Sequence, residues 1–249
     1  FPSNFAYAAP RTVAQALDLL AEHGDGAKLL AGGHSLIPAL KLRLLEPAIL
    51  IDLGRVEGLR GISLDGDALV IGAGTPHAEV AASALVQRHA PLVAQAAAVI
   101  GDVQVRNRGT IGGSSAHADP AADYPVALTA AGASFVLAAQ AGERTVPADD
   151  FFVDYLTTAL EPTEVLTQVR VPVVPAGAAS AYAKLPHPAS GYVVVSAGVL
   201  LQRDAAGRCT SARIAVGGLA GTPHRATATE AALAGSDLSP DAVRAAAAL

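Results

Sequence analysis

Apolar side chains near the N-terminus recur first at helical spacing and then in short continuous runs. Residues 12 to 22 predict a helix with Thr12 as N-cap and Gly24 as stop, and with apolar positions at Val13, Ala16, Leu17 and Leu20. The runs at 27 to 31 and 48 to 53 predict buried strands, and residues 35 to 44 between them predict a helix. Strand, helix and strand in this order predict a βαβ unit, from which parallel sheets are built.

The pattern changes in the middle of the chain. Apolar runs at 59 to 64 and 68 to 73 flank Asp65-Gly66, a dipeptide typical of a hairpin turn. The remaining pattern predicts helices at 77 to 89, 91 to 100 and 121 to 130, and strands at 134 to 139, 143 to 146 and 165 to 171.

A Pro/Gly-rich stretch at 172 to 177 predicts a domain boundary. Beyond it, runs at 179 to 184, 192 to 203 and 209 to 217 predict a three-stranded antiparallel sheet, with helices from about Arg225. We therefore expect an α+β fold with parts at 1–55, 56–174 and 175–249. The last part ends within a helical pattern, and we expect it to be truncated.

Composition excludes several classes of protein. Hydrophobic residues make up 51% of the 249, but no run approaches the roughly 20 apolar residues of a membrane span. The net charge is −5, without the Lys/Arg cluster of a nucleic-acid-binding protein. Cys209 is the only cysteine, so the chain cannot form an internal disulfide or hold a cysteine-ligated iron–sulfur cluster by itself. No signal peptide is recognisable, and a cytoplasmic location is expected.

Two glycine-rich segments carry the candidate chemistry. The first glycine segment is Lys28 to Ser35, with Gly32-Gly33, and the second is Thr110 to Ser114, with Gly112-Gly113. Each is expected beside an apolar strand, and each places paired glycines before a small hydroxyl residue. Glycine lets backbone amides approach a phosphate without a Cβ in the way. Two such segments predict that one long anion, a dinucleotide pyrophosphate, is held from both sides.

Two common nucleotide motifs are absent. The chain has no G-x-x-x-x-G-K-[ST], which argues against a P-loop NTPase. Residues 72 to 77 begin like G-x-G-x-x-G, but the third glycine is missing and Pro76 intrudes. We interpret this stretch as the end of a strand, so a Rossmann domain is not supported.

The wider sequence resembles the flavoprotein (medium) subunits of the molybdenum hydroxylases, and most closely the carbon monoxide dehydrogenase type. The matching motifs run in order along nearly the whole chain: Ala31 to Pro38, Lys41 to Leu44, Val105 to Ser114, Ala118 to Pro125, Phe151-Phe152, Thr157 to Leu160, Glu164 to Leu166, Tyr182 to Lys184 and His187 to Tyr192. Any one alone is weak, but as a set they are specific.

This resemblance implies a fold and a cofactor. FAD would lie between two subdomains of the vanillyl-alcohol-oxidase (PCMH) type, covered by a small C-terminal domain, and would be bound non-covalently. No catalytic or metal-binding residue is implied. The residues that the resemblance assigns to FAD are Lys28, Leu29, Leu30, Ala31, Gly32, Gly33, His34, Ser35, Ile100, Thr110, Ile111, Gly112, Gly113, Ser114, Asp123, Leu166, Lys184 and Tyr192.

Five of these residues have implied roles and a plainer alternative. The resemblance places Asp123 on the adenosine side, but it is also a carboxylate at a helix start. Ile100 and Leu166 match apolar cofactor contacts or are ordinary core residues. Lys184 would lie near the flavin and favour its anionic reduced form, or is a solvated strand lysine. Tyr192 would cover the isoalloxazine ring, or is a strand aromatic that faces the core.

Three histidines leave alternatives open. His34 stands in a Gly-Gly-His context that links flavin covalently in some secreted oxidases, although non-covalent binding is expected here. His117, beside Asp119, is a catalytic candidate or a hydrogen-bonding strut. His187 is expected near the flavin edge, with the same two alternatives.

The leading functional hypothesis is an FAD-binding electron-transfer subunit. The resemblance implies a small partner with two 2Fe-2S clusters and a large molybdopterin subunit, in a dimer of heterotrimers. Electrons would leave FAD for an external acceptor such as quinone, dioxygen or NAD, and the complex could associate with a membrane. The alternatives are a stand-alone FAD-dependent oxidase with its own substrate, and a redox-inactive nucleotide-binding scaffold.

Overall fold

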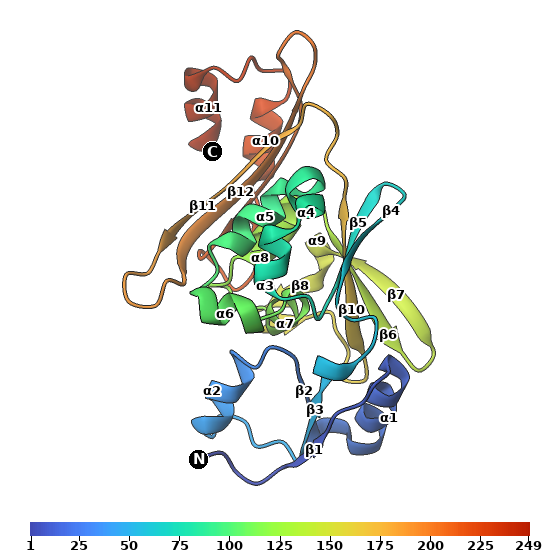
Figure 1. The fold of residues 1–249 in the computed structure, drawn as a ribbon. Coiled ribbons are helices and arrows are strands. Elements are labelled where there is room, and N and C mark those ends of the chain that lie inside the picture. The colour runs from blue at the N-terminus through green and yellow to red at the C-terminus, as the bar shows by residue number, and fades with distance from the viewer.

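A computed structural model describes residues 1–249 and contains three main sheets (Figure 1). The N-terminal sheet has the order β1-β3-β2, and both pairings are parallel. It consists of β1 (Ala6–Ala8), β2 (Ala27–Leu30) and β3 (Ile49–Asp52), with the helices α1 (Val13–His23) and α2 (Leu36–Lys41) and the 3-10 turns η1 (Gly24–Gly26) and η2 (Leu53–Arg55). The predicted βαβ unit is therefore present as β2-α2-β3.

The first helix follows its sequence signals. The Thr12 side chain accepts a hydrogen bond from the Gln15 amide at 3.2 Å, and Gly24 ends α1 with φ of 50°. The helix buries the predicted apolar face against β2 and β3.

Helix α2 is shorter than the predicted 35 to 44. Arg43 has φ of 55°, and the amides of Arg43 and Leu44 donate to the carbonyls of Leu40 and Ala39. These crossed bonds form a Schellman motif, which ends a helix without glycine at the cost of a left-handed Arg43.

The central sheet is antiparallel, with the order β4-β5-β10-β6-β7. The predicted hairpin turn at Asp65-Gly66 joins its first two strands. The strands are β4 (Ile62–Asp65), β5 (Ala68–Gly72), β6 (Ser134–Ala139), β7 (Gly142–Pro147) and β10 (Val165–Pro172), and a small separate pair is β8 (Phe152–Asp154) and β9 (Thr157–Thr158).

Helices cover one side of this sheet (Figure 1) and enclose the main core of 30 buried residues. They are α3 (His77–Ala82), α4 (Ala84–His89), α5 (Pro91–Ala98), α6 (Val103–Arg108), α7 (Ile111–His117), α8 (Tyr124–Ala130) and α9 (Ala148–Phe151). The single helix predicted at 77 to 89 is broken at Ser83, which has ψ of 121° and caps α4. In the core, Phe135 and Phe151 stack with their ring centroids 3.9 Å apart.

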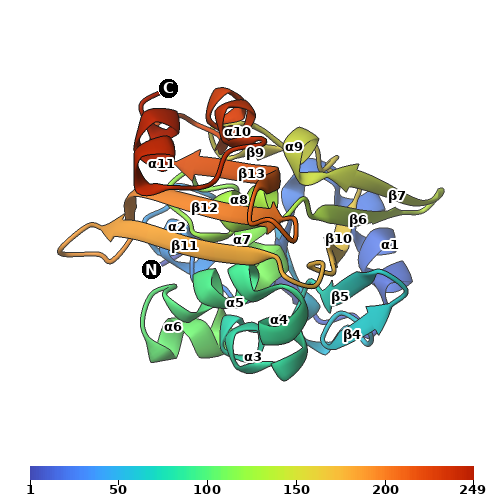
Figure 2. The same ribbon diagram turned by 90° about the horizontal axis from the view of Figure 1, so that it is seen from above.

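The C-terminal sheet has four strands, so the prediction of three was wrong. It comprises β11 (Ala179–Pro186), β12 (Val193–Arg203), β13 (Cys209–Gly217) and β14 (His224–Arg225), followed by α10 (Thr227–Leu233) and α11 (Pro240–Ala247). The missed strand is β14, which has only two residues and so carries too little pattern to be recognised from the sequence. Ion pairs of Arg225 with Asp149 and Glu230 hold it in place. Helix α8 packs against β12 and β13 from the central part (Figure 2).

The second glycine segment lies in a helix rather than in a loop after a strand. Gly112 and Gly113 belong to α7, Thr110 is its N-cap, and the preceding element is the helix α6. The second segment therefore does not directly follow a strand, although α7 lies against the strand β10 as expected. The reason is side-chain capping: Asp102 caps α6, and Thr110 accepts a hydrogen bond from the Gly113 amide at 3.1 Å.

One histidine is buried under these helices. His77 is 4% exposed, its ring lies 5.2 Å from the Tyr124 ring, and its Nδ1 has no hydrogen-bond partner. Burial, with smaller contributions from the charges of His34 and Arg106, lowers its pKa from 6.5 to about 4. His77 is therefore neutral in the folded chain at neutral pH.

We predict that acid destabilises the fold through His77. Between pH 6.5 and 4 the unfolded chain binds a proton at this residue that the folded chain does not, so the free energy of unfolding falls as the pH falls. The expected loss from pH 7.5 to pH 5 is about 2 kcal/mol for this group. Urea unfolding at the two pH values measures it. His77→Gln should remove this component, whereas a change at the exposed His224, His224→Gln, should leave it in place; an unaltered pH dependence in His77→Gln would contradict the assignment.

Candidate functional site

The two glycine segments meet at one point, although they are far apart in the sequence. A Cβ added to Gly32 would lie 2.4 Å from the Arg108 carbonyl oxygen and 2.6 Å from the Gly109 Cα. A Cβ added to Gly113 would lie 3.5 Å from the Cβ of Ala31 and 2.8 Å from Oγ1 of Thr110. Only glycine fits at position 32, and its lack of a side chain lets the first segment lie directly against the backbone that leads into the second.

Free backbone donors are found in the first segment. The amides of residues 32 to 35 donate no hydrogen bond within the protein, and Gly33 has φ of 80°. By contrast, the amides of residues 111 to 114 are all bonded within the chain. The two segments are therefore not equivalent: the first offers N–H groups, and the second offers the hydroxyls of Thr110 and Ser114.

A third segment, which the sequence interpretation missed as part of the site, supports the second one. The strand β5 ends at Gly72 as expected, but the residues after it pair with the backbone before α7. The His77 amide donates to the Gly109 carbonyl at 3.0 Å, and the Ile111 amide donates to the Thr75 carbonyl at 3.1 Å. A Cβ on Gly109 would lie 2.5 Å from Nε2 of His77. In the sequence, the one signal for this contact is the glycine at position 109, where a side chain would collide with His77.

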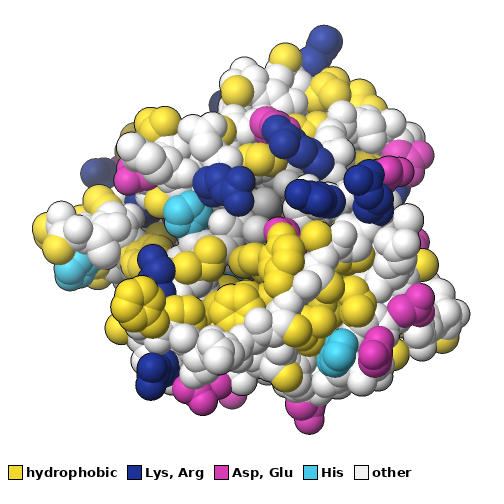
Figure 3. All heavy atoms as spheres, turned by 60° about the horizontal axis from the view of Figure 1, so that its bottom comes forward, with side chains coloured by type: hydrophobic (Ala, Val, Ile, Leu, Met, Phe, Trp, Pro, Cys, Tyr) yellow, Lys and Arg dark blue, Asp and Glu magenta, His cyan; other side chains and the backbone are white.

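Basic side chains lie close to the meeting point. Arg106 donates to the carbonyls of Ile100 and Gly101 at 3.0 and 2.9 Å, which joins the end of α5 to α6. Arg108 is exposed and has no acidic partner, as is also true of Lys28. Figure 3, viewed from the side of the N-terminal sheet, shows a hollow with Lys and Arg side chains on one side and hydrophobic side chains on the other. Such surroundings suit an anion attached to an apolar body.

Asp123 and Lys184 form one buried cluster with Tyr182. The Asp123 side chain is 4% exposed and that of Lys184 10% exposed, with Nζ 3.0 Å from Oδ1. The Tyr182 hydroxyl donates to the same Oδ1 at 2.9 Å, and Lys184 Nζ also donates to the carbonyls of Val99 and Gly191 at 2.8 and 3.2 Å. Burial raises the pKa of Asp123, and the bonds from Lys184 and Tyr182 oppose that shift. The alternative of a solvated strand lysine was therefore wrong.

The ion pair brings together two residues that the family resemblance assigns to different parts of FAD. The resemblance places Asp123 and Lys184 at different parts of the cofactor, whereas the structure joins them in one ion pair. Asp123 precedes α8, but its side chain makes no capping hydrogen bond to that helix.

The remaining assigned residues differ in exposure. Leu166 is buried in the main core, and Ile100 packs against it while partly exposed. Tyr192 is 54% exposed, so the alternative that it faces the core was wrong. His34 is exposed beside the free amides of the first segment.

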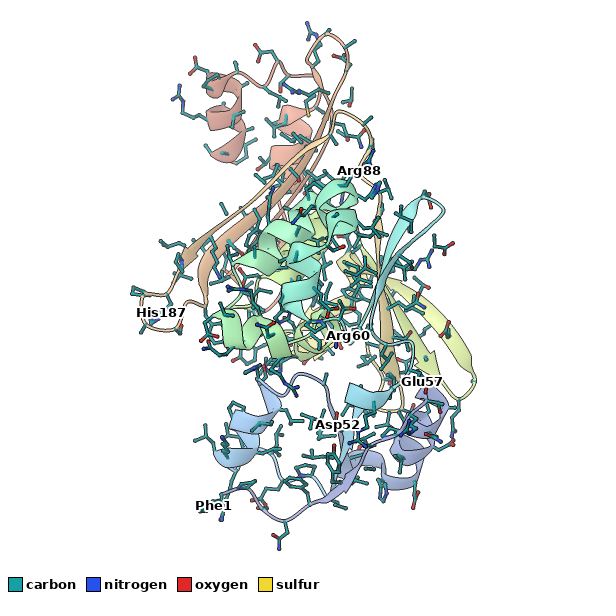
Figure 4. The ribbon with its side chains drawn as sticks, viewed as in Figure 1. Phe1, Asp52, Glu57, Arg60, Arg88 and His187 are labelled. Carbon is teal, nitrogen blue, oxygen red and sulfur yellow. The ribbon has the colours of Figure 1, made fainter.

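The other candidate side chains do not gather into a catalytic group. His117 is exposed at the end of α7. His187 lies at the tip of the β11–β12 hairpin (Figure 4), where its Nδ1 accepts from the Ala189 amide at 3.3 Å. Cys209 is buried, and no three His, Cys, Asp or Glu side chains are arranged to bind a metal. None of the helices has both the length and the apolar character that crossing a membrane requires.

Two family models cover almost all of the chain. Residues 3–174 match the FAD-binding domain in molybdopterin dehydrogenase, and residues 180–249 match the C-terminal domain of the CO dehydrogenase flavoprotein. The order of these matches is the order in which the sequence motifs occur.

Individual relatives match nearly the whole of this chain. The chain is 43% identical to the carbon monoxide dehydrogenase medium chain of Hydrogenophaga pseudoflava, over 99% of this chain and 85% of that one. It is 39% identical to the 6-hydroxypseudooxynicotine dehydrogenase complex subunit alpha of Paenarthrobacter nicotinovorans, over 99% and 83%. A solved structure of the Hydrogenophaga pseudoflava carbon monoxide dehydrogenase superposes with a TM-score of 0.96 at 46% identity, covering 100% of this chain and 86% of that one. The chain therefore belongs to the FAD-binding (medium) subunits of the molybdenum hydroxylase family, which are parts of oxidoreductase complexes.

Proposed function

We propose that FAD binds non-covalently where the two glycine segments meet, with its pyrophosphate on the free amides of residues 32 to 35. The observation that carries this proposal is that row of four unpaired N–H groups beside the contact between Gly32 and Arg108. Backbone amides that converge without an internal acceptor are suited to an anion. The Ser35, Thr110 and Ser114 hydroxyls and the unpaired Arg108 would add donors around the same phosphates.

The assigned apolar and aromatic residues would hold the rest of the cofactor. Ile100 and Leu166 would make apolar contacts with the cofactor, and Tyr192 would cover the isoalloxazine from the hairpin. Asp123 would accept a ribose hydroxyl or contact the adenine through the small part of its carboxylate that Lys184 and Tyr182 leave free. Bound FAD supplies the ability to take up two electrons and to release them singly or together. The chain itself binds, orients and shields that group.

We further propose that this subunit relays electrons between partners. One buried cysteine cannot hold an iron–sulfur cluster, so electrons would reach the flavin from a small subunit with 2Fe-2S clusters. Substrate would be oxidised on a large molybdopterin subunit, in a dimer of heterotrimers. Relatives that are named as chains of carbon monoxide and 6-hydroxypseudooxynicotine dehydrogenases support this arrangement. An external acceptor, quinone, dioxygen or NAD, would take the electrons, in the cytoplasm or at a membrane reached through the complex.

The proposed FAD site predicts the cofactor content of the protein. The chain purified with its co-expressed neighbouring subunits should show a flavin absorption spectrum, and acid should release FAD, because no covalent bond is expected. Visible spectra and chromatography of the acid extract measure both. Flavin that stays with the precipitated protein would instead indicate attachment through the exposed His34. Absence of FAD from the complex and from the isolated chain would refute the proposed function.

A bulky side chain in the second glycine segment should weaken FAD binding. In Gly113→Val the new Cβ would lie 2.8 Å from Oγ1 of Thr110, and its methyl groups would enter the space next to Ala31. We expect FAD affinity to fall by at least about a hundredfold, that is by about 2.7 kcal/mol of binding free energy. Flavin fluorescence on titration of the FAD-free protein measures the affinity.

Two controls accompany this change. Gly113→Ala adds the Cβ without the branches and should give an intermediate loss. Gly26→Ala, in the turn η1 before β2, meets only the Ala48 Cβ at 3.4 Å and should bind FAD normally. Wild-type affinity in a folded Gly113→Val protein, as shown by its melting curve, would remove the second segment from the site.

A further inference from the structure

The cluster of Asp123, Lys184 and Tyr182 joins two parts of the chain that match different family domains. Asp123 lies directly before α8, and Gln95 and Val99 lie in and after α5, all within residues 3–174. Tyr182 and Lys184 lie on β11, within residues 180–249. The bonds of this cluster therefore connect the C-terminal hairpin to the FAD-binding domain.

Every donor in the cluster is used. An ammonium group has three N–H bonds, and those of Lys184 are directed at Asp123, the Val99 carbonyl and the Gly191 carbonyl. Tyr182 contributes twice: its hydroxyl donates to Asp123, and its amide donates to Oε1 of Gln95 at 2.9 Å. Because a buried carboxylate is costly unless it is hydrogen-bonded, the Tyr182 hydroxyl contributes directly to keeping Asp123 ionised and in place.

One bond of the cluster and one separate backbone bond fix the backbone on the two sides of Tyr192. The Gly191 carbonyl accepts from Lys184, and the Val193 amide donates to the Ala121 carbonyl at 3.1 Å, two residues before Asp123. Beyond these anchors the hairpin projects from the molecule, with His187 at its tip (Figures 1 and 4). The hairpin side chains Leu185 and Val194 are exposed, so apolar burial beside these anchors is confined to Val193.

We propose that this cluster is a latch that holds the β11–β12 hairpin against the FAD-binding domain, with Tyr182 as the positioning residue that orients Asp123 for Lys184. The inference rests on the proposed FAD site, because the hairpin carries Tyr192 to the flavin. Opening the latch exposes the flavin and precedes its release. Tyr182 itself acts through Asp123 and does not contact the cofactor.

Tyr182→Phe tests the latch, because it retains the ring and removes only the hydroxyl that donates to Asp123. The variant is made in the full chain, purified in complex with its partner subunits and FAD. We expect amide hydrogen exchange of residues 187 to 194, the FAD release rate and quenching of flavin fluorescence by iodide all to rise, the first two by about tenfold. A residue that only stabilises the fold would lower the melting temperature without increasing iodide access to the flavin.

Tyr7→Phe is the matched control, since the Tyr7 hydroxyl also donates to a carboxylate, Oδ2 of Asp52 at 2.6 Å, but at an exposed position in the N-terminal sheet. It should leave all three measurements unchanged. Gln95→Leu removes the acceptor of the Tyr182 amide and should raise hairpin exchange as Tyr182→Phe does. Exchange and FAD release within twofold of wild type in Tyr182→Phe would overturn the latch. A wild-type complex without FAD would refute the proposed function alone, and hydrogen exchange in the flavin-free protein would still test the latch.

Discussion

The approach of Gly32 to the Arg108 carbonyl is the constraint on which the candidate cofactor site depends. At this point any side chain would lie within 2.4 Å of backbone oxygen, so the two segments meet only because position 32 has no Cβ. The contact sets the amides of residues 32 to 35 beside the start of α7 while leaving them without internal acceptors. If the two segments lay further apart, these amides would face water, away from the Thr110 and Ser114 hydroxyls and the Arg108 guanidinium.

This contact is tied to the core by backbone bonds rather than by side chains. The backbone that touches Gly32 is itself bonded to residues 73 to 77, which continue from β5 of the central sheet. His77 fills the space under Gly109 and stays neutral because it is buried. A charged imidazolium ion at this position would need a polar partner, and the packing provides none. The close packing of Gly109 on His77 therefore also requires that the ring is neutral.

Local signals allowed much of the fold to be predicted, and tertiary contacts account for what was missed. The cap at Thr12, the Asp65-Gly66 turn and the apolar run of β6 each act within a few residues, and the elements lie where they were expected. The helix break depends on the cap at Ser83, and the strand β14 depends on two ion pairs of Arg225. Neither kind of interaction is visible in the hydrophobic periodicity of the sequence. Paired glycines marked both segments of the candidate site, but Tyr182 is 59 residues from Asp123, and only the folded hairpin brings them together.

The ion pair also limits what Lys184 can do for a flavin. An isolated cation near the ring would stabilise the anionic reduced form, but here the ammonium lies 3.0 Å from a carboxylate. The pair has no net charge, so it acts on a nearby group as a dipole, whose potential falls with distance more steeply than that of a single charge. If Lys184 faces the flavin as the family resemblance implies, its influence on the redox potential depends on orientation, with the ammonium end closer to the ring than the carboxylate end. Because Asp123, Tyr182 and the Val99 and Gly191 carbonyls fix that orientation, the cluster that holds the hairpin would also set the electrostatic effect of Lys184 on the cofactor.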